Sequence, residues 1–179
     1  MKTTITRRKF ARFVKAAGLT GAIGLSGAGR VAAAPLPRPQ GKVVLTISGL
    51  ISSFNDGDKA EFDMPLLESI GNDSFTTKTP WYKDPVTFSG VPMSRLLDFV
   101  GAKGTSLSVT ALNDYATDIP LEDFKAHPVL LATKRDGQYM PVRDKGPLFI
   151  VYNYDSNSEL QHQRFYSRSA WQVARMVVK

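Results

Sequence analysis

The 179-residue sequence contains no cysteine and only two histidines. Without cysteine, the chain can form no disulfide and offers no thiolate to zinc, an iron–sulfur cluster or another soft metal. The histidines, His127 and His162, are 35 positions apart and have no carboxylate at ligand spacing, so we expect no metal site built on them. The sequence also lacks a G-x-S-x-G turn, a G-x-G-x-x-G motif and a P-loop. Hydrolase, dinucleotide and nucleoside triphosphate sites are therefore without support.

Long hydrophobic runs are also missing. The uncharged stretch from Ala16 to Ala28 falls short of the roughly 20 apolar residues that a membrane-spanning helix needs. It follows a basic segment that contains the pair Arg7 and Arg8 and precedes a small-residue run ending near Ala33. These are the three parts of a twin-arginine signal. A basic amphipathic helix lying on a membrane is the alternative, but it would need Leu and Phe where this stretch has Gly and Ala.

The sequence therefore predicts a twin-arginine signal peptide over residues 1–33 and a periplasmic location. This prediction changes the meaning of the charge, which is +7 for the whole chain. Seven basic residues and no acidic ones lie in the first 33 positions, which leaves sixteen of each sign in the remainder. A neutral mature chain gives no support for binding nucleic acid.

The mature chain is organised as one domain behind a short linker. Residues 34–41 form a proline-rich tether without periodicity, and residues 42–179 are enough for a single core. Alternation and turn signals predict strands over 43–48, 60–62, 75–79, 86–88, 107–111, 129–133, 148–151 and 171–178. Helical spacing predicts helices over 64–70, capped by Asp63, and over 92–100. Many strands and few, short helices predict an α+β fold with a mixed β-sheet core.

Polar residues gather in three loops: Asn113-Asp114-Tyr115, residues 143–147 (RDKGP) and residues 164–168. Each could be a turn or solvated charge. Their order along the chain points to a functional interpretation.

The segments VTFSGVPMSRLLDFVGAKG, ALNDYATDIPLEDF, PVLLATKRDGQYMPVRDKGPLFIVYNYD and SRSAWQVARMVV together resemble the molybdopterin-binding domain of the sulfite oxidase family, especially its small exported bacterial members. The resemblance runs from about residue 41 to 179. It implies the sulfite-oxidase-type fold, a molybdenum-pterin cofactor, and Arg143, Lys145 and Gly146 in the loop that holds the pterin phosphate, where two cations suit an anion. Asn113, Asp114 and Tyr115 match the family's polar loop beside the pocket. Twin-arginine export, which carries folded proteins, fits a cofactor inserted in the cytoplasm.

The missing cysteine departs from this pattern. Catalytic members of the family ligate molybdenum with a cysteine on the segment before the GVPMSRLLDF-like helix, where this chain has FTTKTPWYKDP. Thr77, Thr79 or Tyr82 could offer oxygen there, although a hydroxyl is a weak substitute for a thiolate and Tyr82 would need a lowered pKa. Trp81 could instead be the aromatic wall of an empty pocket.

Two hypotheses remain open, and neither assigns a catalytic residue. In the first, the chain is an exported, molybdopterin-dependent oxidoreductase-like domain. In the second, it is a cofactor-free periplasmic sensor or accessory module on the same fold. The expected partners are a pterin or small anionic ligand, with a membrane-bound redox or sensor protein.

Overall fold

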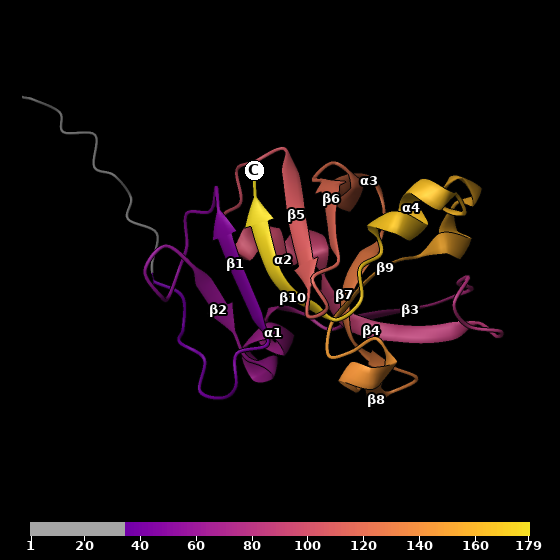
Figure 1. The fold of residues 1–179 in the computed structure, drawn as a ribbon, viewed down its shortest axis with the longest axis horizontal. Helices are drawn as coiled ribbons and strands as arrows, with labels where there is room; N and C mark the ends of the chain where they lie inside the picture. The colour runs from indigo at the N-terminus through magenta and orange to yellow at the C-terminus, as the bar shows by residue number, and fades with distance from the viewer. Residues whose placement is uncertain (1–34) are drawn as a thin grey trace, which may run out of the picture. The chain divides into compact units, whose positions relative to one another are not determined.

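The computed structural model describes residues 35–179, which form two β-sheets and several short helices (Figure 1). The predicted α+β class with a mixed-sheet core is confirmed. The predicted signal peptide, residues 1–33, lies outside the described residues.

The first sheet contains the last strand of the chain in its middle. Its strand order is β2-β1-β10-β5-β6. The pairing of β1 with β10 is parallel, and the other three pairings are antiparallel, so the sheet is mixed. Its strands are β1 (Leu45–Gly49), β2 (Ala60–Phe62), β5 (Ser106–Ala111), β6 (Ala116–Pro120) and β10 (Val173–Val178).

The second sheet is antiparallel throughout and is built on β7. The order is β3-β4-β7-β8, and β9 also pairs with β7. An Asp136-Gly137 turn joins β7 to β8, with φ of 49° and 78°, as a tight hairpin turn requires. Its strands are β3 (Asp73–Thr77), β4 (Val86–Pro92), β7 (Val129–Arg135), β8 (Gln138–Tyr139) and β9 (Phe149–Tyr152).

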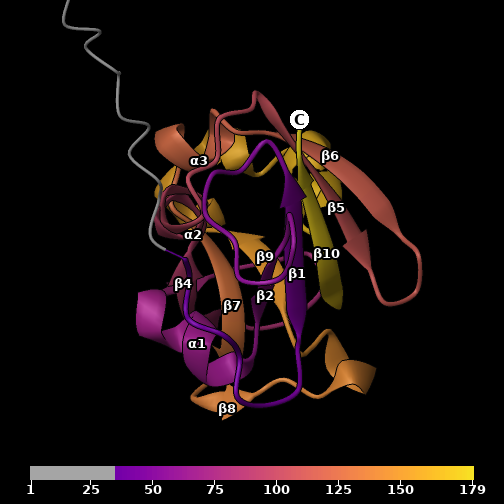
Figure 2. The same cartoon turned by 90° about the vertical axis from the view of Figure 1, so that its left-hand side faces the viewer.

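Short helices and 3-10 turns connect the strands. Figure 2 shows α1 (Met64–Ile70) and α2 (Met93–Phe99) on the side of the β1–β10–β5 layer where β4 and β7 also lie. No helix within residues 35–179 is long and apolar enough to cross a membrane. The remaining helical elements are α3 (Asp123–Ala126), α4 (Gln163–Arg168), η1 (Val142–Asp144), η2 (Tyr154–Ser156) and η3 (Ser158–Leu160).

The start of α1 is fixed as its sequence predicts. The Asp63 Oδ1 accepts a hydrogen bond from the Leu66 amide at 2.9 Å, and Oδ2 accepts from the amides of Gln40 and Gly41 at 2.7 Å each. Residues 35–41, the described part of the predicted tether, form no helix or strand but are held along the domain by these bonds. Leu36 packs against the core.

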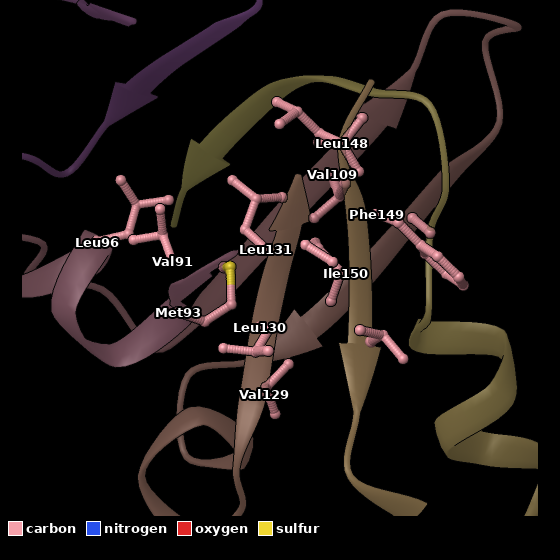
Figure 3. Close-up of a cluster of buried hydrophobic side chains, with 14 of the residues drawn as sticks. Val91, Met93, Leu96, Val109, Val129, Leu130, Leu131, Leu148, Phe149 and Ile150 are labelled. Atoms are coloured by element: carbon pink, nitrogen blue, oxygen red, sulfur yellow. The ribbon is translucent and has the colours of Figure 1, made fainter. Parts of the chain in front are cut away.

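The core lies where the two sheets and α2 meet. Val109 of β5, Leu131 of β7 and Ile150 of β9 are fully buried and point toward one another in Figure 3. Phe62 and Phe99 join the first sheet to α2, with ring centroids 6.3 Å apart. One continuous core therefore fixes both sheets and the loops at their ends.

The structure corrects the sequence analysis at several elements, including β3, β10, β6 and α4. The strand predicted over 75–79 is β3, which ends at Thr77 because the Lys78 amide donates to the Asp155 carboxylate instead of to β4. The strand predicted from 171 begins at Val173, because Gln172 has a φ of 55° that a strand cannot accommodate. Neither β6 nor α4 was predicted.

Candidate functional site

Two of the three polar loops singled out by the sequence, those around residues 113–115 and 143–147, meet at Gln172. The Gln172 carbonyl accepts from the Leu112 amide at 2.9 Å, and the Gln172 amide donates to the Lys145 carbonyl at 3.1 Å. Its side-chain Nε2 donates to the Val142 carbonyl at 2.6 Å. The left-handed backbone at Gln172 thus joins the loop after β5, the loop after η1 and the segment before β10.

A cavity of about 410 Å³ opens beside this junction. We call it the tryptophan pocket, because Trp81 and Trp171, the only two tryptophans of the chain, both line it. Their rings meet edge to face, with centroids 5.7 Å apart. The lining residues are Pro80, Trp81, Asn113, Tyr115, Gln163, Tyr166, Ser167, Ser169 and Trp171.

Trp81 is held in place by an aromatic cluster. Its ring lies 5.4 Å from Phe149, 6.2 Å from Tyr154 and 6.1 Å from Tyr166, measured between centroids, and all three contacts are edge to face. Such contacts fix ring orientation. Trp81 lines the pocket, as in the alternative that made it the aromatic wall of an empty pocket.

The polar loop after β5 supplies one rim of the pocket. Asn113 Oδ1 accepts from the Tyr115 amide at 3.2 Å, and the Tyr115 hydroxyl donates to the Ser167 carbonyl at 2.8 Å. Asp114 is not among the lining residues, and its carboxylate lies 3.8 Å from the Arg175 guanidinium. Two of the three residues predicted here, Asn113 and Tyr115, therefore line the cavity.

None of the predicted phosphate-binding residues lines the pocket, although Lys145 lies against Trp171 in its wall. The Lys145 ammonium is 4.6 Å from the ring centroid of Trp171 and 5.7 Å from that of Tyr82. Arg143 is exposed on η1. Gly146 is packed so closely that a side chain there would overlap the Met140 carbonyl. The role of these residues in holding a phosphate stays a prediction.

The oxygen donors proposed for a metal are engaged in other bonds. The Thr77 hydroxyl is buried, accepts from the Asp155 amide at 3.1 Å and donates to the Lys78 carbonyl at 3.3 Å. Thr79 Oγ1 accepts from the Trp81 amide at 3.3 Å.

Tyr82 would need its pKa lowered to act as a ligand, but burial raises this pKa, even though a 2.8 Å hydrogen bond from Arg135 opposes the shift. Arg135 also pairs with Asp144 at 2.7 Å, which lowers the pKa of that carboxyl. These donors do not fit molybdenum, because each has a structural partner and none is a thiolate. Within residues 35–179, no three His, Asp or Glu side chains gather in a way that could hold a metal ion.

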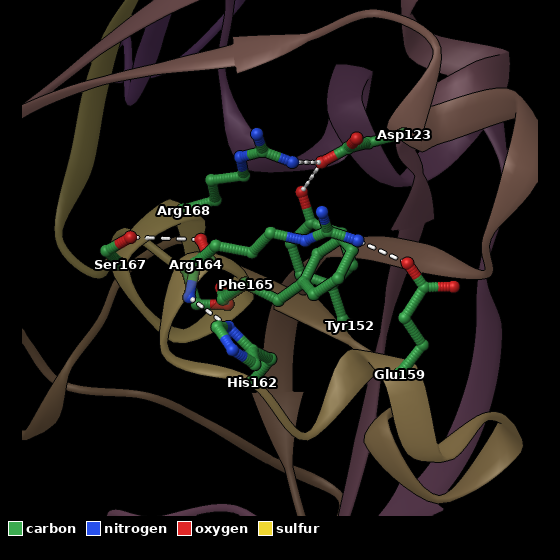
Figure 4. Close-up of polar contacts among 9 residues, drawn as sticks. Asp123, Tyr152, Glu159, His162, Arg164, Phe165, Ser167 and Arg168 are labelled. Carbon is green, nitrogen blue, oxygen red and sulfur yellow. Dashed lines mark hydrogen bonds and ion pairs between the residues drawn. The ribbon is translucent and has the colours of Figure 1, made fainter.

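A cluster of polar contacts joins α4 to α3 and β9 (Figure 4). Asp123 Oδ2 accepts from the Tyr152 hydroxyl and from Arg168 Nη1, both at 2.8 Å. Arg164 pairs with Glu159, and the ring of His162 accepts from the Arg164 amide at 3.4 Å to cap α4. The sequence analysis did not identify Asp123 or Tyr152. An aspartate directly before a phenylalanine, followed much later by a tyrosine in an apolar strand, was the only available signal.

The family model described as oxidoreductase molybdopterin binding domain matches residues 60–153, more than half of the chain. The match runs from β2 to the end of β9 and includes Asn113 and Lys145, but stops before α4 and Trp171. No curated protein matches the chain. The chain therefore belongs to the family of oxidoreductase molybdopterin-binding domains.

Proposed function

We propose that this chain is an exported binding module of its family, which holds a small organic ligand in the tryptophan pocket and uses no protein-ligated molybdenum. The observation that carries the proposal is the state of the Thr77, Thr79 and Tyr82 hydroxyls. All three are committed to hydrogen bonds within the domain. A preformed cavity with fixed aromatic walls supports the binding role.

A second candidate keeps the pterin. The family match and the Lys145 ammonium beside Trp171 favour a molybdopterin held without a bond from protein to metal. Arg143 and Lys145 would then hold its phosphate, as the family resemblance implies.

Metal and pterin analysis of the exported protein separates the two candidates. The protein is purified from its own host, dialysed, and assayed for molybdenum by mass spectrometry and for released pterin by fluorescence. A cysteine-containing family member, exported by the same host, serves as the control for cofactor loading. We expect far less than one molybdenum and one pterin per chain. A stoichiometric, dialysis-resistant molybdenum signal would overturn the proposal, and pterin without molybdenum would favour the second candidate.

Export is tested through the arginine pair. Replacing Arg7 and Arg8 together by lysine should trap the precursor in the cytoplasm, because the twin-arginine machinery reads the guanidinium groups and not merely their charge. Arg12→Lys is the matched control and should leave export unchanged. A normal periplasmic yield from the double variant would contradict the assignment.

A further inference from the structure

The tryptophan pocket is uncharged. Its nine lining residues are aromatic, amide or hydroxyl side chains and one proline, with no Lys, Arg, Asp or Glu among them. A lining of this composition disfavours a charged ligand, because moving an ion out of water without a partner is unfavourable.

Three cations near the pocket are already engaged by other groups. Arg168 is bound to the buried Asp123 at 2.8 Å, and Arg164 is paired with Glu159. The Lys145 ammonium lies on the rings of Trp171 and Tyr82. An anion in the pocket could take a counter-charge from these three side chains only by breaking one of these contacts.

The volume of the pocket and its lining residues indicate the size, the flatness and the hydrogen-bonding groups of the ligand. A volume of about 410 Å³ is at the lower end for ligand sites and suits one or two rings. The walls of Trp81, Tyr166 and Trp171 favour a flat π-face. Asn113 and Gln163 bring side-chain amides, which can both donate and accept hydrogen bonds at the ligand's edge.

We propose that the tryptophan pocket binds an uncharged, planar heteroaromatic compound, with its face against one of the two tryptophans and its polar edge toward Asn113 and Gln163. The inference rests on the proposed function and names the ligand class of the same site. It differs from the anionic ligand that the sequence analysis expected, because the cations named there are not among the lining residues.

Three pyridine compounds that differ in charge provide the test: nicotinamide, which is neutral, nicotinate, which is an anion, and 1-methylnicotinamide, which is a cation. Glucose serves as an uncharged ring without a π-face. The readout is the pair of indole N–H signals in the NMR spectrum of the ¹⁵N-labelled protein, since the chain has two tryptophans and both line the pocket. We expect nicotinamide to shift both signals saturably and to bind at least ten-fold more tightly than the two charged compounds and glucose.

Two rim variants locate the site. Asn113 and Gln163 are exposed and lie outside the core, so Asn113→Ala and Gln163→Ala should stay folded and should each weaken nicotinamide binding several-fold. Gln138→Ala, on exposed β8, is the matched control and should bind as the parent protein does.

The binding measurements either support this inference or overturn it. Tighter binding of nicotinate, 1-methylnicotinamide or glucose, equal binding of all four compounds, or no saturable shift with nicotinamide would overturn this inference. Unchanged binding in both rim variants would overturn it as well. The inference can fail while the molybdenum assay still supports a metal-free module, and stoichiometric molybdenum would overturn the proposed function whatever the charge preference.

Discussion

At the scale of single residues, Thr77 lies in the segment where the family resemblance implies a metal-ligating cysteine. Its buried hydroxyl joins the end of β3 to the Asp155 amide. Thr77→Val keeps the shape of the side chain but leaves that amide without its acceptor, so we expect a loss of about 1 to 2 kcal/mol in the free energy of unfolding. Thr76→Val, whose hydroxyl is exposed and pairs with Thr87, should cost less than about 0.5 kcal/mol. Urea titrations of both variants measure this difference, and equal losses would contradict it.

A second prediction concerns the backbone conformation of Lys145. Its φ of 65° lies in the left-handed region, which costs a non-glycine residue about 1 to 2 kcal/mol. Both Lys145→Gly and Lys145→Ala remove the ammonium, but we expect the glycine variant to be more stable by about 1 kcal/mol. At Arg143, within the 3-10 turn η1, the order should reverse and alanine should be the more stable. Urea midpoints report both pairs, and the same order at the two positions would rule out the strain argument.

At the scale of elements, α1 depends on a charged cap. Hydrogen bonds from the amides of Leu66, Gly41 and Gln40 lower the pKa of Asp63 in the folded state. Its contribution to stability is therefore complete above the ordinary pKa of an aspartate and is lost as the pH falls through the lowered value.

Asp63→Asn should melt several degrees lower than the parent at neutral pH, and the two melting temperatures should converge in acid. Asp58→Asn, at an exposed turn position, is the control and should track the parent throughout. Thermal melts followed by circular dichroism over a pH series are the measurement. A gap that stays constant down to about pH 3 would show that the charge plays no part.

The sequence predicted the elements whose signals are local. Helix α1 was located to the residue, because Asp63, Pro65 and Gly71 mark its two ends, and β2 was located equally well. Strand β6 was missed because it is an edge strand that pairs only with β5 and carries Asp118 and Pro120, which disfavour strands. Helix α4 was missed because it buries a single residue, Phe165, and so has no apolar periodicity.

The candidate site was predictable in part for the same reason. Asn113 and Tyr115 stand in a polar loop between strands, which a sequence displays directly. The contacts of Trp81 with Trp171, and of Asp123 with Tyr152 and Arg168, join positions far apart in the chain. No local pattern encodes such pairings, because the packing of the two sheets creates them.

At the scale of the whole molecule, buried tyrosines limit stability in alkali. Burial raises the pKa of Tyr152 and of Tyr154 in the folded domain, and the bond from Tyr152 to Asp123 raises the former further. Unfolded tyrosine ionises near pH 10, so the stability these groups confer is complete below that pH and falls as the pH rises above it. The melting temperature should therefore drop above about pH 10. Tyr152→Phe, normalised to its own value at pH 7, should drop less steeply, and identical slopes would contradict the assignment.

The position of β10 has a consequence for the order in which the domain can form. Thr46 of β1 pairs with Arg175 of β10, and β10 separates β1 from β5 in the sheet. While the ribosome is still making residues before 173, β1 and β5 each present an open edge and the first sheet cannot close. Folding of this sheet is therefore delayed until synthesis has passed the central strand, and open edges of this kind are what chaperones shield. A chain cut before β10 would lack the middle of a sheet, so we expect a loss of solubility and not a smaller stable domain.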